Sequence, residues 1–199
     1  MLSKKNLVLI ILLLLIPVAA RRIKIGINIL PASYYARSLE GTGTAEDPFI
    51  INDFEGLERL SDKYFWNQDY KLEAYYKLSA DIDASATRKN YKEGKGWEPI
   101  GSEEGKFRGV FDGNGYKIKN LYINRKNEDY IGLFAFSTGT IKNLEMVNVK
   151  FEGDTKVGGL IGGSNTGITS EGEGKVINSS VEGTVKGNAV VGGGRNTWL

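Results

Sequence analysis

The sequence predicts an all-β protein, a β-solenoid whose first turn is covered by an N-terminal segment of mixed α and β structure. Three observations carry this prediction. Residues 101–199 contain 20 of the 26 glycines, which indicates frequent turns. Short stretches that alternate apolar and polar residues lie between those turns, as in β-strands. One six-residue pattern also recurs, and repeats of roughly 20 to 45 residues are typical of solenoids.

The recurring pattern occupies Ile118–Ile123, Ile141–Met146 and Val176–Val181, at spacings of 23 and 35 residues. Its first residue is apolar and would point into the solenoid, and its second would point out. Its third residue is always asparagine. Asparagine adopts the left-handed backbone region at lower cost than most other residues, so it marks a corner between strands.

Stacking of the repeats at a strand separation of about 4.8 Å predicts a ladder of side-chain amides. The residues of this structural ladder are Asn120, Asn143 and Asn178. The same register predicts an aliphatic column of Ile118, Ile141 and Val176. Ordinary hairpin turns are the alternative interpretation of the three asparagines.

The first half of the chain lacks this repeat and predicts a mixture of strands and a helix. Phe49–Ile51 predicts a short strand, and Asp53 can cap a helix that places Leu57 and Leu60 on one face. A second strand is expected around Tyr76–Leu78. Such a segment can cover the first turn of a solenoid, which would otherwise expose bare strand edges to water.

The N-terminus is typical of an exported protein. Two lysines precede an apolar run of ten residues, Leu7–Ile16, and small residues follow. This run is about half as long as a membrane span, so a retained anchor is the weaker interpretation. We predict a signal peptide at 1–20, with an alternative cut near residue 32, a linker at 21–40, the cap at 41–106 and the β-helix repeats at 107–199.

Composition excludes several kinds of chemistry. The chain has no histidine and no cysteine, which removes Ser-His and Cys-His nucleophiles, imidazole or thiolate metal sites and disulfides. The net charge is only +2. Sequence-independent nucleic-acid binding is therefore not expected. Carboxylate, lysine or tyrosine chemistry survives this test.

A set of motifs between about residues 41 and 193 resembles the GLUG-motif proteins. The motifs that carry the likeness are Gly41–Thr44, Asp47–Phe49, Leu78–Asp83, Trp97–Gly101, Phe107–Gly115, the three Asn-containing repeats and Val157–Gly162. The resemblance implies a right-handed parallel β-helix of the pectin-lyase-like type with an N-terminal α/β cap. It also implies a secreted or surface-attached, adhesin-like protein.

The chain departs from that pattern after Gly193, where an aliphatic residue is expected and Gly194 stands instead. We therefore expect a truncated or frameshifted piece of a longer parent with more repeats. A nonfunctional remnant is a further interpretation.

Two acidic segments are candidate sites. Asp112 lies between turn residues, and a glycosidase needs a second carboxylate at a fixed distance, for which Glu145 and Glu182 are the exposed candidates. Turn chemistry explains Asp112 better. Asp81–Ser85 begins like a calcium loop, but Ala86 stands where the turn needs glycine. We expect no metal, no cofactor and no catalytic residue.

Six aromatic residues gather within thirteen positions, from Tyr64 to Tyr76. Aromatic faces stack on sugars, so we select four of them as a candidate carbohydrate platform: Tyr64, Trp66, Tyr70 and Tyr75. Packing of the cap is the simpler alternative for this cluster.

The sequence thus predicts a non-enzymatic, structural or adhesin-like β-helix module on the cell surface or secreted. Carbohydrate or a cell-surface protein is the expected partner, and the signal segment is the expected membrane contact. The alternative is a polysaccharide lyase or glycoside hydrolase that uses carboxylate and lysine groups on the flank of the β-helix.

Overall fold

The structure, a computed structural model, describes residues 39–61, 72–163 and 174–192, without the side chains of 189–192. The chain divides into two units, Met1–Ser38 and Leu39–Leu199, and every described residue belongs to the second. The predicted signal peptide and three residues of the predicted carbohydrate platform, Tyr64, Trp66 and Tyr70, lie outside the described residues.

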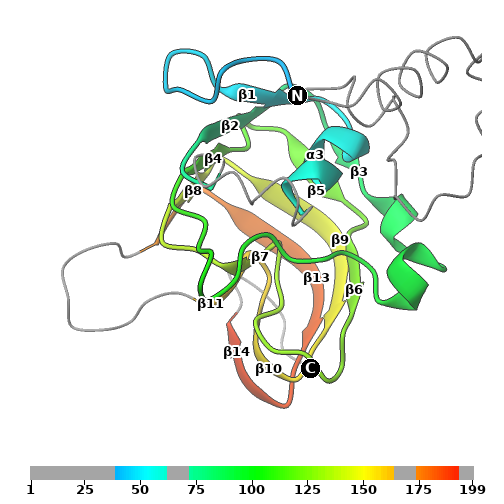
Figure 1. Ribbon diagram of the computed structural model, residues 1–199. Helices are drawn as coiled ribbons and strands as arrows, with labels where there is room; N and C mark the ends of the chain where they lie inside the picture. Colours follow the sequence, from blue (N-terminus) through cyan, green and yellow to red (C-terminus); the bar gives the residue numbers. More distant parts are fainter. Residues whose placement is uncertain (1–38, 62–71, 164–173, 193–199) are drawn as a thin grey trace, which may run out of the picture. The chain divides into compact units, whose positions relative to one another are not determined.

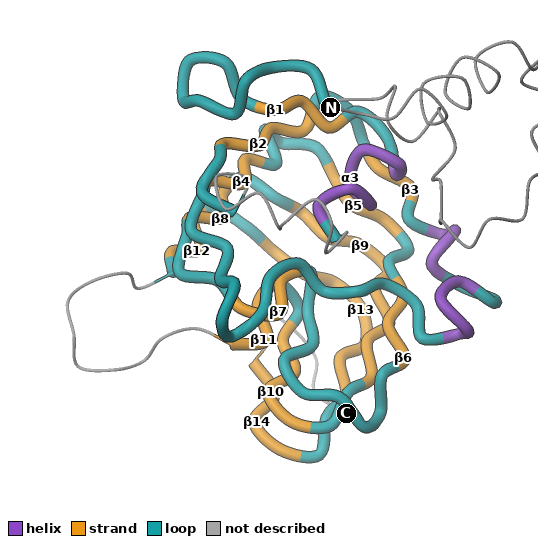
Figure 2. The backbone as a smooth tube through the Cα atoms, in the orientation of Figure 1, coloured by secondary structure: helices purple, strands orange, loops and turns teal. Residues whose placement is uncertain are grey.

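The second unit is a parallel β-solenoid, which confirms the predicted fold class (Figures 1 and 2). Its elements are β1 (Phe49–Ile51), α3 (Phe54–Leu60), β2 (Tyr75–Leu78), β3 (Ile82–Asp83), two short 3₁₀ turns (Ser85–Thr87 and Tyr91–Gly94), β4 (Val110–Asp112), β5 (Lys117–Lys119), β6 (Tyr122–Asn124), β7 (Phe134–Phe136), β8 (Thr140–Lys142), β9 (Glu145–Glu152), β10 (Thr155–Gly158), β11 (Ile161–Gly163), β12 (Lys175–Ile177), β13 (Ser180–Lys186) and β14 (Ala189–Gly192).

Two larger sheets form the flanks of the solenoid. In sheet A the strands lie in the order β1-β2-β4-β8-β12, and in sheet B the order is β13-β9-β5-β3, with β6 paired to the second half of β9. Two smaller pairs, β7 with β11 and β10 with β14, complete the turns. Every pair of strands is parallel, so the chain completes one coil between neighbouring strands of a sheet (Figure 1).

Stacked apolar side chains fill the interior. In sheet A the inward column is Phe49, Tyr76, Phe111, Ile141 and Val176, and in sheet B it is Ile82, Ile118, Met146 and Val181. Aromatic rings join sheet A to the β7–β11 pair, because the ring of Phe134 on β7 lies 4.8 Å from that of Phe107 and 5.6 Å from that of Phe111 on β4. Full burial of such a side chain stabilises the fold by about 1.5–3 kcal/mol.

The N-terminal end is covered as the sequence predicts. Asp53 caps α3 by accepting a hydrogen bond from the backbone N–H of Gly56 at 2.7 Å. Leu57 and Leu60 lie on the buried face of the helix. The free edge of β1 is also occupied, because Ile50 donates its N–H to the carbonyl of Glu40.

The other end of sheet A is more open. Val176 continues the inward column, but it is 49% exposed where Ile141, one strand below, is fully buried. Among the described residues no strand pairs with the outer edge of β12.

The strands of residues 41–106 join the same sheets as those after residue 107. The predicted boundary between cap and repeats therefore interrupts no sheet.

We predict that Phe134→Ala lowers the free energy of unfolding by about 3–5 kcal/mol, because it empties a buried aromatic contact with Phe107 and Phe111. Urea unfolding followed by circular dichroism measures the change. Tyr116→Ala is the control, because Tyr116 is 36% exposed and should change stability by no more than about 0.5 kcal/mol. Equal losses in the two variants would contradict the proposed core.

Candidate functional site

The corners between sheets A and B carry a column of polar side chains. Asn178 donates its side-chain amide to Oδ1 of Asn143 at 3.0 Å, and Asn143 donates to Oδ1 of Asp112 at 3.1 Å. Asn143 and Asn178 have φ of 52° and 45°, in the left-handed region that asparagine tolerates. The column therefore begins on a carboxylate, which only accepts, and continues through amides, which both donate and accept.

A second column lies at the next corner of each coil. Asn148 donates to Oδ1 of Asn120 at 2.6 Å, and Asn120 donates to Oδ1 of Asp83 at 2.9 Å. A third corner repeats the pattern with Asn188 donating to Oδ1 of Asp154 at 2.6 Å. Each of the three columns starts on an aspartate.

The predicted single ladder of Asn120, Asn143 and Asn178 was therefore wrong in one member. Asn143 and Asn178 do stack, but Asn120 belongs to the second column. Stacked corner residues are 28 to 37 positions apart, so the spacing of 23 residues separates two corners and is not the length of a coil. The predicted aliphatic column is wrong in the corresponding member. Ile141 and Val176 stack in sheet A, but Ile118 pairs with Ile82 and Met146 in sheet B.

Both carboxylate oxygens of Asp112, the candidate residue for sugar cleavage, have bonding partners. Its Oδ1 accepts from Asn143 and from the backbone N–H of Asn114 at 2.8 Å, and its Oδ2 lies 3.2 Å from Nζ of Lys142. Partial burial opposes ionisation, but these donors outweigh it and hold the pKa of Asp112 below its ordinary value. Such a carboxylate is an ionised acceptor, whereas a general acid needs a raised pKa.

Two of the other acidic candidates, Glu145 and Asp81, also bond to neighbouring coils. Glu145 pairs with Lys117 at 2.9 Å, and Asp81 pairs with Lys119 at 2.7 Å. Hydrogen bonding to Lys119 is the main cause that lowers the pKa of Asp81. Within the described ranges, no three acidic side chains gather in an arrangement that could hold a metal ion.

The outer face of sheet A displays the one described member of the predicted carbohydrate platform. Tyr75 is 39% exposed on β2, and Lys77 lies on the same face because strand side chains alternate. Lys77 stands in register with Asp112 on β4, which in turn pairs with Lys142 on β8. The four residues thus form one contiguous surface across three coils.

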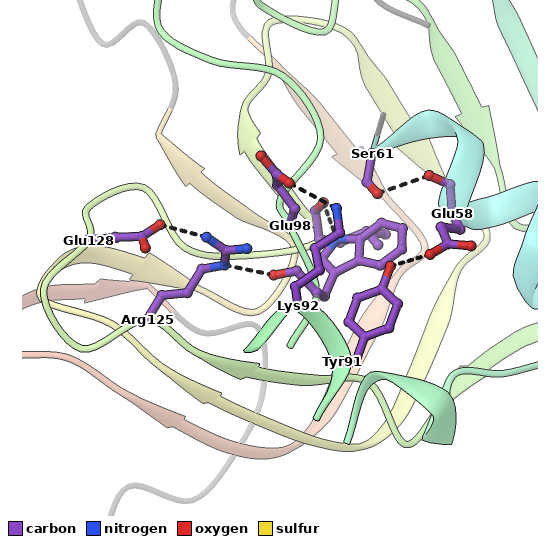
Figure 3. A network of polar contacts seen from close by, with 9 residues as sticks. Glu58, Ser61, Tyr91, Lys92, Glu98, Arg125 and Glu128 are labelled. Carbon is purple, nitrogen blue, oxygen red and sulfur yellow. Dashed lines mark hydrogen bonds and ion pairs between the residues drawn. The ribbon is translucent and has the colours of Figure 1, made fainter. Parts of the chain in front are cut away.

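A polar network near α3, which sequence reasoning missed, is drawn in Figure 3. Tyr91 donates its hydroxyl to Oε1 of Glu58 at 2.5 Å, and Lys92 pairs with Glu98 at 2.8 Å. Burial, with the Glu58 carboxylate second, raises the pKa of Tyr91 far above its ordinary value. Tyr91 therefore stays protonated at neutral pH and is a hydrogen-bond donor, not a base.

Arg125 extends this network into the solenoid. Its side chain is 8% exposed, donates from Nε to the carbonyl of Trp97 at 3.0 Å and pairs with Glu128 at 2.7 Å (Figure 3). Lys92 and Glu93 have φ of 46° and 60°, a backbone strain that the surrounding contacts must hold. The network joins α3 to the following coil, so we assign it a structural role.

The described residues contain no helix long and apolar enough to cross a membrane. No protein-family model matches the chain.

Two relatives are similar in sequence. Halomucin of Haloquadratum walsbyi is 35% identical over 163 residues, 77% of this chain. A protein of Evansella cellulosilytica that is named as a Gly-rich membrane protein is 35% identical over 135 residues, 64% of this chain. The chain spans only 2% of the first relative and 14% of the second.

A solved structure shares the fold. The crystal structure of a Bacteroides ovatus protein named as an immunoglobulin A1 protease has a TM-score of 0.54 and 21% identity. The match covers 72% of this chain and 40% of the other. At this identity the likeness concerns the β-solenoid fold alone.

We predict that Asn143→Asp lowers the free energy of unfolding at pH 7 by about 1–3 kcal/mol, because it replaces an amide donor with a carboxylate that faces Asp112. The deficit should shrink as the pH falls toward about 4, where one of the two facing carboxylates takes up a proton. In the wild type, Asp112 contributes its full stabilisation at pH values above 3.8, the ordinary pKa of an aspartate. That contribution is lost as the pH falls through the lowered pKa of Asp112.

Urea titrations at several pH values test this prediction, with Asn143→Gly as the matched control. Glycine keeps the left-handed corner and loses the amide bonds without adding a charge. Its deficit should change little between neutral pH and about pH 4. A deficit of Asn143→Asp that is equally independent of pH would contradict the contact with Asp112.

Proposed function

We propose that this chain is a non-enzymatic β-solenoid module of a secreted or cell-surface protein, where it serves as a structural and binding scaffold of the GLUG type. The observation that carries the proposal is the use of the corner carboxylates. Asp83, Asp112 and Asp154 each accept a hydrogen bond from an asparagine one coil above. These acids are engaged between coils, and the lowered pKa of Asp83 and of Asp112 disfavours a general-acid role.

The relatives support a place at the cell surface. One of them is named as a membrane protein, and both share 35% identity with this chain. Because the chain spans a small part of each, a repeated module within a larger protein is the interpretation that fits best. The motif set from about residue 41 to 193 supports the GLUG assignment.

We expect no cleavage when the purified protein is incubated with acidic and neutral polysaccharides. Reducing ends and the ultraviolet absorbance of unsaturated products measure hydrolysis and elimination, respectively. Turnover that disappears in Asp112→Asn would show a lyase or hydrolase and overturn the proposal. Lys126→Gln, at a solvent-exposed turn, is the control for a general effect of substitution.

We further expect antibodies against the module to label intact cells that produce the protein. External protease should remove that label without opening the cells. Labelling that requires permeabilised cells would contradict a surface location.

A further inference from the structure

The outer face of sheet A consists of two columns of side chains that run along the solenoid. One column is Tyr75, Val110, Thr140 and Lys175, and the other is Ile50, Lys77, Asp112, Lys142 and Ile177. Successive members lie on neighbouring strands, which stand about 4.8 Å apart. Figure 1 shows the strands β2, β4 and β8 side by side on this flank.

Positive charge is in excess on this face. The two columns contain three lysines, Lys77, Lys142 and Lys175, and one carboxylate, Asp112. Asp112 pairs with Lys142. Among the described residues, Lys77 and Lys175 have no ion-pair partner. Arg108, which adjoins the face, pairs loosely with Glu73 at 3.7 Å.

Sheet B shows that this excess is a property of one flank. Two of its outward lysines are neutralised by ion pairs, Lys117 with Glu145 and Lys119 with Asp81. The other two, Lys150 and Lys186, are matched in number by the carboxylates Glu152 and Glu182 on the same strands, so sheet B has no positive excess. An anionic ligand would therefore be attracted to sheet A and not to sheet B.

An exposed aromatic ring begins the column that ends at Lys175, beside Lys77 of the other column. Tyr75 is two residues before Lys77 on β2, so the two side chains share a face. A tyrosine ring offers a flat apolar surface and a hydroxyl, which together suit a sugar ring. The hydroxyl of Thr140, two strands away in the same column as Tyr75, adds a polar group.

We propose that the outer face of sheet A binds an acidic polysaccharide, with Tyr75 stacked on a sugar ring and Lys77 and Lys142 paired with its carboxylate or sulfate groups. This inference rests on the proposed function and specifies its ligand. Charge complementarity selects the anionic class. The carboxylate of Asp112 between the two lysines would repel the closely spaced phosphates of a duplex, which favours a polysaccharide over nucleic acid.

Affinity electrophoresis of the full chain in gels that contain hyaluronan, chondroitin sulfate or neutral dextran tests the inference, and duplex DNA is a fourth gel. We expect retardation by the two acidic polysaccharides and not by dextran. Tyr75→Ala and Lys77→Gln should each weaken binding about tenfold, the effect of one well-placed contact. Each variant is first checked for an unchanged urea midpoint.

Two matched controls locate the site. Tyr116→Ala removes another exposed tyrosine, and Lys126→Gln removes a lysine that is 63% exposed outside the proposed face. Both should bind like the wild type. Equal weakening by Lys126→Gln, or DNA binding as strong as that of the polysaccharides, would overturn the inference in favour of general cation attraction.

The two proposals fail separately. Absence of retardation in every gel overturns the polysaccharide site and leaves the non-enzymatic module intact. Cleavage of the polysaccharide overturns the non-enzymatic module, while loss of binding in Tyr75→Ala and Lys77→Gln would still support the site.

Discussion

The left-handed corner with an amide bonded to the coil below is the constraint on which the solenoid depends. Where a corner residue adopts positive φ, it must tolerate that backbone, and its side chain must also bond along the axis if successive coils are to keep register. Asparagine meets both demands at Asn120, Asn143, Asn148 and Asn178. An aspartate can end such a column but cannot continue it, because an ionised carboxylate has no proton to donate. The order of aspartate and asparagine therefore gives each column a direction.

Local signals in the sequence were sufficient for the main elements. The capping residue Asp53 and the spacing of Leu57 and Leu60 predicted α3, and short strands were predicted at Phe49–Ile51 and Tyr76–Leu78, where β1 and β2 lie. The assignment of corners to columns required the path of a whole coil. One motif serves two different corners, so a repeat search finds Asn120 and Asn143 together although they belong to different columns.

The candidate surfaces were less predictable, because they join residues that no short pattern connects. Tyr91 and Glu58 are 33 positions apart and meet only after α3 covers the first coil. Lys77 and Lys142 share a face through the register of three strands. Tyr75 was predicted to belong to a carbohydrate platform because of its aromatic ring alone. Its lysine neighbours could not be assigned before the register was known, because a slip of one residue turns a strand's side chains to the opposite face.

The same register that builds the core also sets how the outer face grows. Each coil adds one outward residue to each column of sheet A, at a fixed separation of about 4.8 Å. A chain-like ligand can therefore contact successive coils at once, and contacts that are weak singly add through effective concentration. The relatives are far longer than the stretch that this chain matches. In a protein of that length, weak sites repeated on a rigid flank would give strong attachment to a polymer without any deep pocket.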